Sequence, residues 1–407
     1  MAAKVACPVD DPDLRRLWDF CQHTMVATSF AGLMVDGDRE RIPYEADAYA
    51  TQLAHYGMSS DYAYARKTIE HLYENPTWPT EFLQSSVMSA WLDWMYTGDV
   101  SSVGKWYDVL RREKLLARFA RKTDGLVVSG GERKGGDKFN ALGLADIVDW
   151  PPSERDGFEF REVNAVVNAF HYRNLLEMTD LAEALGRRED SRRFAADAKK
   201  QKESFNRVLF DEGVGLYRDG EGTDHHSLHA NVAALVCGLV PDARRHEVAV
   251  WIAKRGMACS TYFSNFLLTA LFENGREDDA LRLMASDDNR SWLGMLKQGA
   301  TMTMESWNMH VKPNQDWNHS WSAHPVGLVA REICGVRPLK PGFERIGIAP
   351  HIGKLSHIKA KVPTAKGPVG VSYDEGVFTV DTPAPSRFVF KGITRELEKG
   401  RHVIYVD

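Results

Sequence analysis

The chain has 407 residues, of which 43% are hydrophobic and 26% are charged, and its formal net charge at pH 7 is −5. This length exceeds a single simple core, so we expect one large domain and one small domain. The mild negative charge predicts no broad basic surface, which excludes nucleic acid and anionic membranes as expected partners.

Helical patterns follow one another from the start of the chain. Asp11-Pro12-Asp13 is a good N-terminal cap with a proline in the first turn, and it opens a helix that extends to about Ser29. A second pattern covers 44–75 with a break near 57–59. A third helix opens at Pro79-Thr80-Glu81 and has the spacing of one buried face. A fourth, amphipathic helix is predicted over 103–119.

Residues 122–161 interrupt this series with a long segment that is poor in helix signals. Because long structured loops usually carry function, we predict that this segment lies over the mouth of the helical domain. Helical patterns then resume over 163–185, 190–208, 226–239, 242–254, 260–274, 278–285 and 321–334. Ten or more helices joined in hairpins, without a heptad run or a short repeat period, predict a closed ring of helical hairpins rather than a solenoid.

The pattern changes after Gly335-Val336-Arg337-Pro338. Short alternating runs follow, and Gly, Pro and acidic turns separate them, which is typical of antiparallel strands. We predict about six strands, at 345–350, 357–362, 369–373, 377–380, 387–390 and 402–406. The predicted division is therefore a helical domain over 1–337 and a small β-sandwich domain over 338–407.

The cysteines and the first residues indicate the compartment. The five cysteines are odd in number, scattered and without metal-ligand spacing, which favours small core residues in a reducing compartment. Acidic residues follow from Asp10, so the apolar core of a signal peptide is missing. No run approaches the length of a membrane span. We therefore expect a cytoplasmic protein.

An acidic stretch near the start, 36–47, is a candidate acid/base site. Acids and arginines crowd a connection between two helices, and such charges cannot be buried without pairing. Pro43, Tyr44 and the apolar residues 33–35 indicate a fixed, partly enclosed loop. Enclosure raises the pKa of a carboxyl group, which then can donate a proton at neutral pH. The alternative is an ordinary solvated loop.

Two further stretches could carry chemistry. Residues 298–307 place Glu305 among apolar and hydroxyl side chains, where a lone carboxylate should be either paired or functional, and 316–321 gather aromatic and hydrogen-bonding groups. Within the long interruption, 146–156 combine acids, Trp150 and two prolines. The alternative for this last run is a rigid surface loop with local ion pairs.

The histidines at 225, 226 and 229 could suggest zinc. His229 can share a helix face with one of the other two, but no glutamate lies between them as in the metalloprotease motif. Without an obvious third ligand, we expect a structural or substrate-contact role for His229. We predict no metal and no cofactor.

The acidic stretch resembles the acid loop of glycoside hydrolase family 78, the bacterial α-L-rhamnosidases, in the order of Asp36, Arg39, Glu40, Tyr44 and Asp47. Glu305 before Trp307 looks like the general base of that family, and Asn318-His319 resembles its substrate-contacting histidine. Further likeness lies in 335–343, at the join to a C-terminal β domain, and in 363–368. The resemblance extends from about residue 12 to the end.

This resemblance implies an (α/α)6 barrel, followed here by the β-sandwich, and inverting hydrolysis of a terminal α-L-rhamnose or a closely related sugar. It assigns Glu40 as the catalytic acid and Glu305 as the base. Glu40 is expected to stay protonated through partial burial and the charges of neighbouring aspartates. The implied contacts to a carbohydrate substrate are Asp36, Arg39, Tyr44, Asp47, Trp150, Trp307 and His319. Because one residue is missing between Asp36 and Arg39, Asp36 or Asp38 could take the first contact.

Two alternatives have different requirements. Another (α/α)6 enzyme, such as an unsaturated glucuronyl hydrolase or a polysaccharide lyase, would usually need a positively charged pocket for a uronate. A non-catalytic sugar-binding relative would lack one of the two carboxylates, yet both Glu40 and Glu305 are present.

Overall fold

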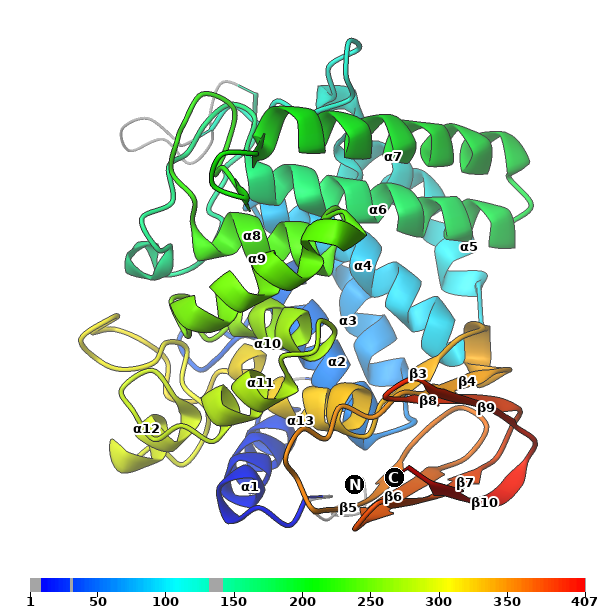
Figure 1. The fold of residues 1–407 in the computed structure, drawn as a ribbon. Helices are drawn as coiled ribbons and strands as arrows, with labels where there is room; N and C mark the ends of the chain where they lie inside the picture. Colours follow the sequence, from blue (N-terminus) through cyan, green and yellow to red (C-terminus); the bar gives the residue numbers. More distant parts are fainter. Residues whose placement is uncertain (1–8, 30–31, 132–141, 407) are drawn as a thin grey trace.

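The structure is a computed structural model that describes residues 9–29, 32–131 and 142–406. A helical domain comes first and a β domain follows it (Figure 1), which confirms the predicted fold class. The helices are α1 (Pro12–Ala27), α2 (Glu45–Met58), α3 (Ala63–Glu74), α4 (Thr80–Thr97), α5 (Ser101–Val109), α6 (Ala165–Ala184), α7 (Arg188–Leu209), α8 (Leu228–Val236), α9 (Asp242–Arg255), α10 (Ser264–Phe272), α11 (Glu277–Met284), α12 (Trp292–Lys297) and α13 (Pro325–Leu328).

The helical domain is a ring with an inner and an outer layer. Within the described residues the inner layer is α2, α4, α6, α8, α10 and α13, which contact one another in this order, and α13 closes the ring against α2. Outer helices precede them along the chain and pack behind them. Every residue of α10 is buried, whereas α7 buries only one face. A helix surrounded by protein has no need of an amphipathic period, while a surface helix does.

Glycines allow α2 and α13 to close the ring. A Cβ atom at Gly327 would lie 2.5 Å from the carbonyl oxygen of Leu53, and one at Gly57 would lie 3.0 Å from the Cα of Gly327. These neighbours are backbone atoms, so a side chain at either position would push the two helices apart.

Gly327→Ala is therefore expected to destabilise the protein by about 1–3 kcal/mol through overpacking. A matched control is Gly104→Ala, in exposed helix α5, where the added Cβ meets only a side-chain carbon of Leu185 at 3.5 Å. That change should stabilise the helix by about 0.5–1 kcal/mol. Thermal unfolding of both variants checks the prediction; equal melting temperatures for the two would contradict the close approach.

Some helical details differ from the sequence-based expectation. The helix predicted over 321–334 is a 3₁₀ turn (Ser320–Ala323), then α13, then a π-helical turn (Val329–Ile333). Pro325 explains the break, because it lacks a backbone N–H and cannot continue a preceding helix. Helix α12 and the hairpin of β1 (Phe210–Asp211) and β2 (Leu216–Tyr217) were not predicted. They are too short to show a hydrophobic period.

The β domain contains two four-stranded sheets, in the orders β10-β7-β6-β5 and β3-β4-β8-β9. Neighbouring strands are antiparallel except for the parallel pair β4 and β8. Phe378 of one sheet packs against Phe388 and Phe390 of the other, with ring centroids 5.2 and 4.9 Å apart. The strands are β3 (Val336–Pro338), β4 (Ile346–Ile348), β5 (His357–Val362), β6 (Val369–Asp374), β7 (Val377–Thr382), β8 (Ser386–Phe390), β9 (Ile393–Leu397) and β10 (Gly400–Tyr405).

Strands β3 and β9 were missed in the sequence. β3 has three residues and ends in a proline, and the middle of β9 is exposed on both faces, so neither shows the alternation of a half-buried strand. Both lie at the edges of their sheet, where alternation is weakest. The division of the chain after residue 337 stays a prediction.

Cysteines within the described residues are Cys21, Cys237, Cys259 and Cys334; all four are buried, and none forms a disulfide. Cys7 lies outside the described residues. A helix of the length and hydropathy needed to cross a membrane does not occur in the described part of the chain. The cytoplasmic location stays a prediction.

Candidate active site

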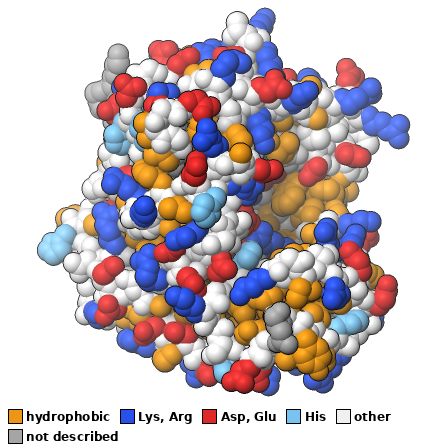
Figure 2. Space-filling model, viewed as in Figure 1, with side chains coloured by type: hydrophobic (Ala, Val, Ile, Leu, Met, Phe, Trp, Pro, Cys, Tyr) orange, Lys and Arg blue, Asp and Glu red, His pale blue; other side chains and the backbone are white. Residues whose placement is uncertain are grey.

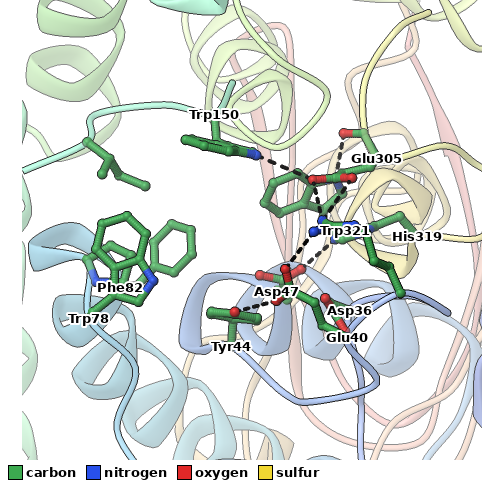
Figure 3. A pocket seen from close by; sticks show the side chains of 13 residues that line it. Asp36, Glu40, Tyr44, Asp47, Trp78, Phe82, Trp150, Glu305, His319 and Trp321 are labelled. Atoms are coloured by element: carbon green, nitrogen blue, oxygen red, sulfur yellow. Dashed lines mark hydrogen bonds and ion pairs between the residues drawn. The ribbon is translucent and has the colours of Figure 1, made fainter. Parts of the chain in front are cut away.

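A pocket opens at the end of the ring where the inner helices begin. Its walls come from the segments that lead into α2, α4, α6 and α13, together with the loop of Glu305 (Figure 3). Most of the predicted site residues line it, although they come from distant parts of the chain. The lining consists of Asp36, Arg39, Glu40, Tyr44, Asp47, Trp78, Pro79, Phe82, Ile147, Trp150, Glu305, His319 and Trp321.

The acidic loop 36–44 is fixed by the segment that precedes α13. The backbone N–H of Arg39 donates to the carboxylate of Asp316 at 3.0 Å, and that of Asp38 donates to the side-chain oxygen of Asn318 at 3.2 Å. A Cβ atom at Gly37 would lie 2.7 Å from Asp316, so glycine is required for this approach. These contacts hold the loop at the pocket edge, as its proline and apolar entry predicted.

Glu305 is buried on the opposite side of the pocket and accepts several hydrogen bonds. Its carboxylate accepts from Lys312 Nζ at 3.0 Å, from the backbone N–H of Asp316 at 3.1 Å and from the indole N–H of Trp150 at 3.3 Å. Arg39 Nη2 lies 3.5 Å from both of its oxygens. Glu305 is thus fixed in position by donors only, which suits a carboxylate that accepts a proton from water.

Glu40 occupies a more open position. Its carboxylate accepts from Arg39 Nη1 at 2.8 Å and from the hydroxyl of Tyr44. Burial and the nearby Glu40 raise the pKa of the Tyr44 hydroxyl, so Tyr44 stays a donor to Glu40. The side chain of Glu40 is 33% exposed and pairs with Arg39, and the acid role expected for Glu40 stays a prediction. The short loop places Glu40 at the rim and leaves the deeper position to Asp36.

Three buried groups form a proton-holding cluster beneath the rim. His319 Nε2 lies 2.7 Å from Asp47, and its Nδ1 lies 3.8 Å from Asp316. Burial alone would lower the pKa of His319, but the nearby carboxylates of Asp316 and Asp47 raise it to about 10. His319 is therefore protonated at neutral pH and presents a fixed positive charge to the pocket wall.

Asp36 is the buried carboxyl group of the acidic loop. Burial and the charge of Asp47 together raise the pKa of Asp36 to about 6, and His319 opposes the rise. Asp36 lines the pocket and is 2% exposed, whereas Asp38 is exposed, pairs with Arg41 at 3.8 Å and does not line the pocket. The placement favours Asp36 over Asp38 for the first substrate contact.

Asp36→Asn is expected to stabilise the protein in a pH-dependent way. Because the pKa is raised in the folded state, the stability contribution of Asp36 is complete below pH 3.8 and lost as pH rises through about 6. The free energy of unfolding of the variant should therefore exceed that of the wild type by up to about 3 kcal/mol at pH 8 and by little at pH 4. Thermal unfolding at the two pH values measures this.

A useful control is Asp99→Asn, at the start of α5. Hydrogen bonds from the backbone and hydroxyl of Ser101 and from Arg66 lower the pKa of Asp99 to about 2. The contribution of the Asp99 carboxylate to folding stability is present above pH 3.8 and is lost only as pH falls toward 2. Asp99→Asn should therefore lower the stability equally at pH 5 and pH 8. A parallel pH trend in both variants would contradict the assignment of Asp36.

Trp150 reaches the pocket because its loop is anchored below it. Asp149 accepts from His229 Nε2 at 2.8 Å and from the backbone N–H of Ser260 at 2.9 Å, which ties the loop to α8 and to the start of α10. His229 is fully buried in this role, so it has a structural contact and does not line the pocket. Ile147 and Trp150 place part of the interruption 122–161 at the pocket, while 132–141 lie outside the described residues.

Trp307 does not line the pocket, contrary to the prediction. It is fully buried, its indole N–H donates to the carbonyl oxygen of Cys259 at 2.7 Å, and its ring packs edge-on against Trp292. Trp321 takes the position at the wall instead: its indole N–H donates to the backbone oxygen of Glu305 at 3.0 Å, and its ring stacks on Tyr262. Trp307 is thus a core residue behind the Glu305 loop.

The apolar wall and Lys312 were not predicted. Trp78 and Phe82 lie across the pocket from the carboxylates (Figure 3). Trp78 stands between prolines 76 and 79 at a helix start, a signal that could have placed it at a pocket rim. Lys312 lies seven residues from Glu305 in an irregular loop, so spacing cannot reveal the pair. Glu45, another acid of the stretch 36–47, is buried away from the pocket, where it accepts from the backbone N–H of Thr77 at 3.1 Å.

One group of potential metal ligands occurs among the described residues. Glu305, Asp316 and His319 each offer a donor atom, and these atoms lie within 4.8 Å of one another. Arg39 and Lys312 already pair with Glu305, and His319 carries a proton between two carboxylates. The cations of the protein therefore fill the place that a metal would take, and we assign this group to an ion-pair network.

Comparisons with known proteins agree with this architecture. A solved α-L-rhamnosidase from Dictyoglumus thermophilum has 17% identity and a TM-score of 0.78, over 99% of this chain and 50% of that one. A Streptomyces avermitilis α-L-rhamnosidase complexed with L-rhamnose has 16% identity and a TM-score of 0.77, over 100% and 43% of the two chains. A curated α-L-rhamnosidase from Alteromonas sp. (strain LOR) is 26% identical over 256 residues, which are 58% of this chain and 27% of that protein.

The chain thus spans about half the length of these solved relatives and about a quarter of the curated one. The model of the bacterial α-L-rhamnosidase C-terminal domain matches residues 335–388. Residues 2–333 match the model of the bacterial α-L-rhamnosidase 6 hairpin glycosidase domain. The ring of helical hairpins, the pocket at its mouth and this match over most of the chain show that the protein belongs to the family of bacterial α-L-rhamnosidase six-hairpin glycosidase domains.

Proposed function

We propose that this chain is an inverting glycoside hydrolase that releases terminal α-L-rhamnose, or a closely related sugar, from oligosaccharides or glycosides. The observation that carries the proposal is the pair Glu40 and Glu305, which face one pocket from two unrelated loops. The identity of the sugar is proposed from the names of the relatives, and the class of reaction is proposed from the chemistry of the pocket.

The environments of the two carboxylates suit different roles. Arg39 contacts both, so their separation is limited to the span of one guanidinium group and its two contacts. This is compatible with the roughly 6.5–9.5 Å that an inverting enzyme needs to place a water between the base and the sugar. Glu305, fixed by four donors, would take the proton of that water. Glu40, at the open rim, would protonate the leaving glycosidic oxygen.

The remaining pocket residues would hold the sugar. Asp36, Asp47 and protonated His319 offer acceptors and a donor for its hydroxyl groups. Trp78, Phe82, Trp150 and Trp321 offer flat apolar faces for its ring and its 6-methyl edge. The excess of carboxylates over cations in this lining disfavours a uronate, which weighs against a glucuronyl hydrolase or a lyase.

A screen of p-nitrophenyl glycosides tests the proposal. We expect fastest release from the α-L-rhamnoside and slower release from the α-L-mannoside, which differs from it only by a 6-hydroxyl that would face the apolar wall. Cleavage of an unsaturated uronide with no action on any nitrophenyl glycoside would support the alternative class instead. Binding of rhamnose without turnover of any substrate would support a non-catalytic relative.

A further inference from the structure

A second pocket lies at the other end of the ring, where the inner helices finish. It is formed by Trp91 and Tyr96 of α4, by Arg173 of α6, and by residues near the ends of α8, α10 and α13. Its volume of about 200 Å³ is comparable to the 150 Å³ of the candidate active site. Figure 2 shows a hollow with hydrophobic side chains on this face, between the region of α4 and α6 and the β domain.

A column of aromatic rings separates the two pockets. Trp321 lines the candidate active site and stacks on Tyr262, Tyr262 contacts Phe266, and Phe266 stacks on Tyr49 at 6.2 Å. Phe266 and Tyr49 line the second pocket. The two pockets therefore share a wall but have separate openings, and a ligand in one cannot replace a ligand in the other.

The charges of the second pocket are internally paired. Arg173 donates to Glu177 at 2.7 Å and to the Tyr49 hydroxyl at 3.0 Å. Arg331 donates to Glu332 at 2.9 Å, and Glu332 also pairs with Arg337. A further carboxylate, Glu273, lines the pocket as well. Because each guanidinium already has a counter-charge, the pocket is unsuited to an anion.

Asn265 gives this pocket a polar group that a ligand could bind, which a plain packing defect would lack. The residue is 3% exposed and lines the cavity, yet its side-chain amide has no hydrogen-bond partner among the described residues. The amide of Asn168 in α6, by contrast, pairs through both its oxygen and its nitrogen with the backbone of Val127. The amide atoms of Asn265 are not enclosed by the protein and are open to the cavity, so a polar group from outside the chain can pair with them there.

We propose that this second pocket binds a neutral saccharide unit, independently of the candidate active site. Asn265 supplies both a donor and an acceptor, and Nη1 of Arg173 and of Arg331 supplies N–H groups with no partner among the described residues. Trp91, Tyr96 and Phe266 supply apolar faces. An amide, guanidinium N–H groups and aromatic rings around a charge-balanced cavity match hydroxyl groups on an apolar ring.

The test uses Asn265→Leu, which keeps the volume and removes hydrogen bonding. Crystals of the wild type are soaked in L-rhamnose, D-glucose, benzoate and phenol, and binding is measured by calorimetry in solution. We expect sugar density beside Asn265 and a binding component that weakens about tenfold or more in Asn265→Leu. The melting temperature without sugar should change little in this variant, because no hydrogen bond within the described residues is lost.

Asn206→Leu is the matched control. The Asn206 amide donates to the backbone oxygens of Lys202 and Leu239, so its replacement should lower the melting temperature and leave sugar binding unchanged. Absence of sugar density in the second pocket, or sugar binding that Asn265→Leu does not weaken, would overturn the proposal. So would occupation of the pocket by benzoate or phenol alone, which would assign it to another ligand class.

Discussion

Replacing Glu305 by glutamine is expected to reduce kcat on an aryl α-L-rhamnoside by about 10²–10⁴-fold or more. Glutamine keeps the shape, and its single oxygen can still accept from Lys312, although its NH2 group cannot accept from Trp150; it cannot take a proton from water. Sugar binding should change far less than kcat, because the hydroxyl contacts come from other residues. Steady-state kinetics and a direct binding measurement for L-rhamnose separate the two effects.

Glu154→Gln is a matched control for the loss of a buried, ion-paired carboxylate. Glu154 is 1% exposed and pairs with Arg290 at 2.9 Å, but it does not line the candidate active site. This variant should keep its activity per folded molecule. If both variants lost activity in proportion to their stability, Glu305 would be an ion-pair residue and not a base.

Glu40→Gln is expected to have an effect that depends on the leaving group. A natural aglycone or a second sugar needs a proton as the bond breaks, so its hydrolysis should slow by about 10²–10⁴-fold. A nitrophenolate leaves without that proton, so its release should slow much less. The measurement is kcat/KM for a nitrophenyl rhamnoside and for an alkyl rhamnoside, with the wild type and with the variant.

Asp38→Asn provides the comparison on the same loop. Asp38 is exposed beside Arg41 and lies outside the pocket, so neither substrate should respond strongly. If Glu40→Gln slowed the hydrolysis of both substrates equally, the assignment of Glu40 as the acid would be contradicted. A strong, leaving-group-dependent effect of Asp38→Asn would transfer that role to Asp38.

Much of the architecture could be predicted from the sequence because it depends on local patterns. Caps, amphipathic periods and turn residues located most helices and the main strands of the β domain. Helix α10 was predicted too long, at 260–274, because a helix buried on all sides has no polar face to mark its ends. Likewise α12, β3 and β9 are short or edge elements whose patterns are set by tertiary contacts.

The prediction of the candidate active site from the sequence was limited in the same way. The acids of loop 36–47 and Glu305 were identified from their residue types in sequence order. Which aromatic ring lines the pocket depends on the path of the backbone: Trp307 turns into the core behind Glu305, and Trp321 arrives from a later segment. The ion pair of Glu305 with Lys312 and the openness around Glu40 are also tertiary, so no spacing rule predicts them.

The most direct test of the central claim is the anomeric configuration of the first product. Proton NMR during hydrolysis of an aryl α-L-rhamnoside should show β-L-rhamnose first, followed by slower mutarotation to the equilibrium mixture. This result is expected because Glu305 would direct water to the face opposite the leaving group that Glu40 protonates. Initial appearance of α-L-rhamnose would instead show retention, and it would contradict the roles of both carboxylates.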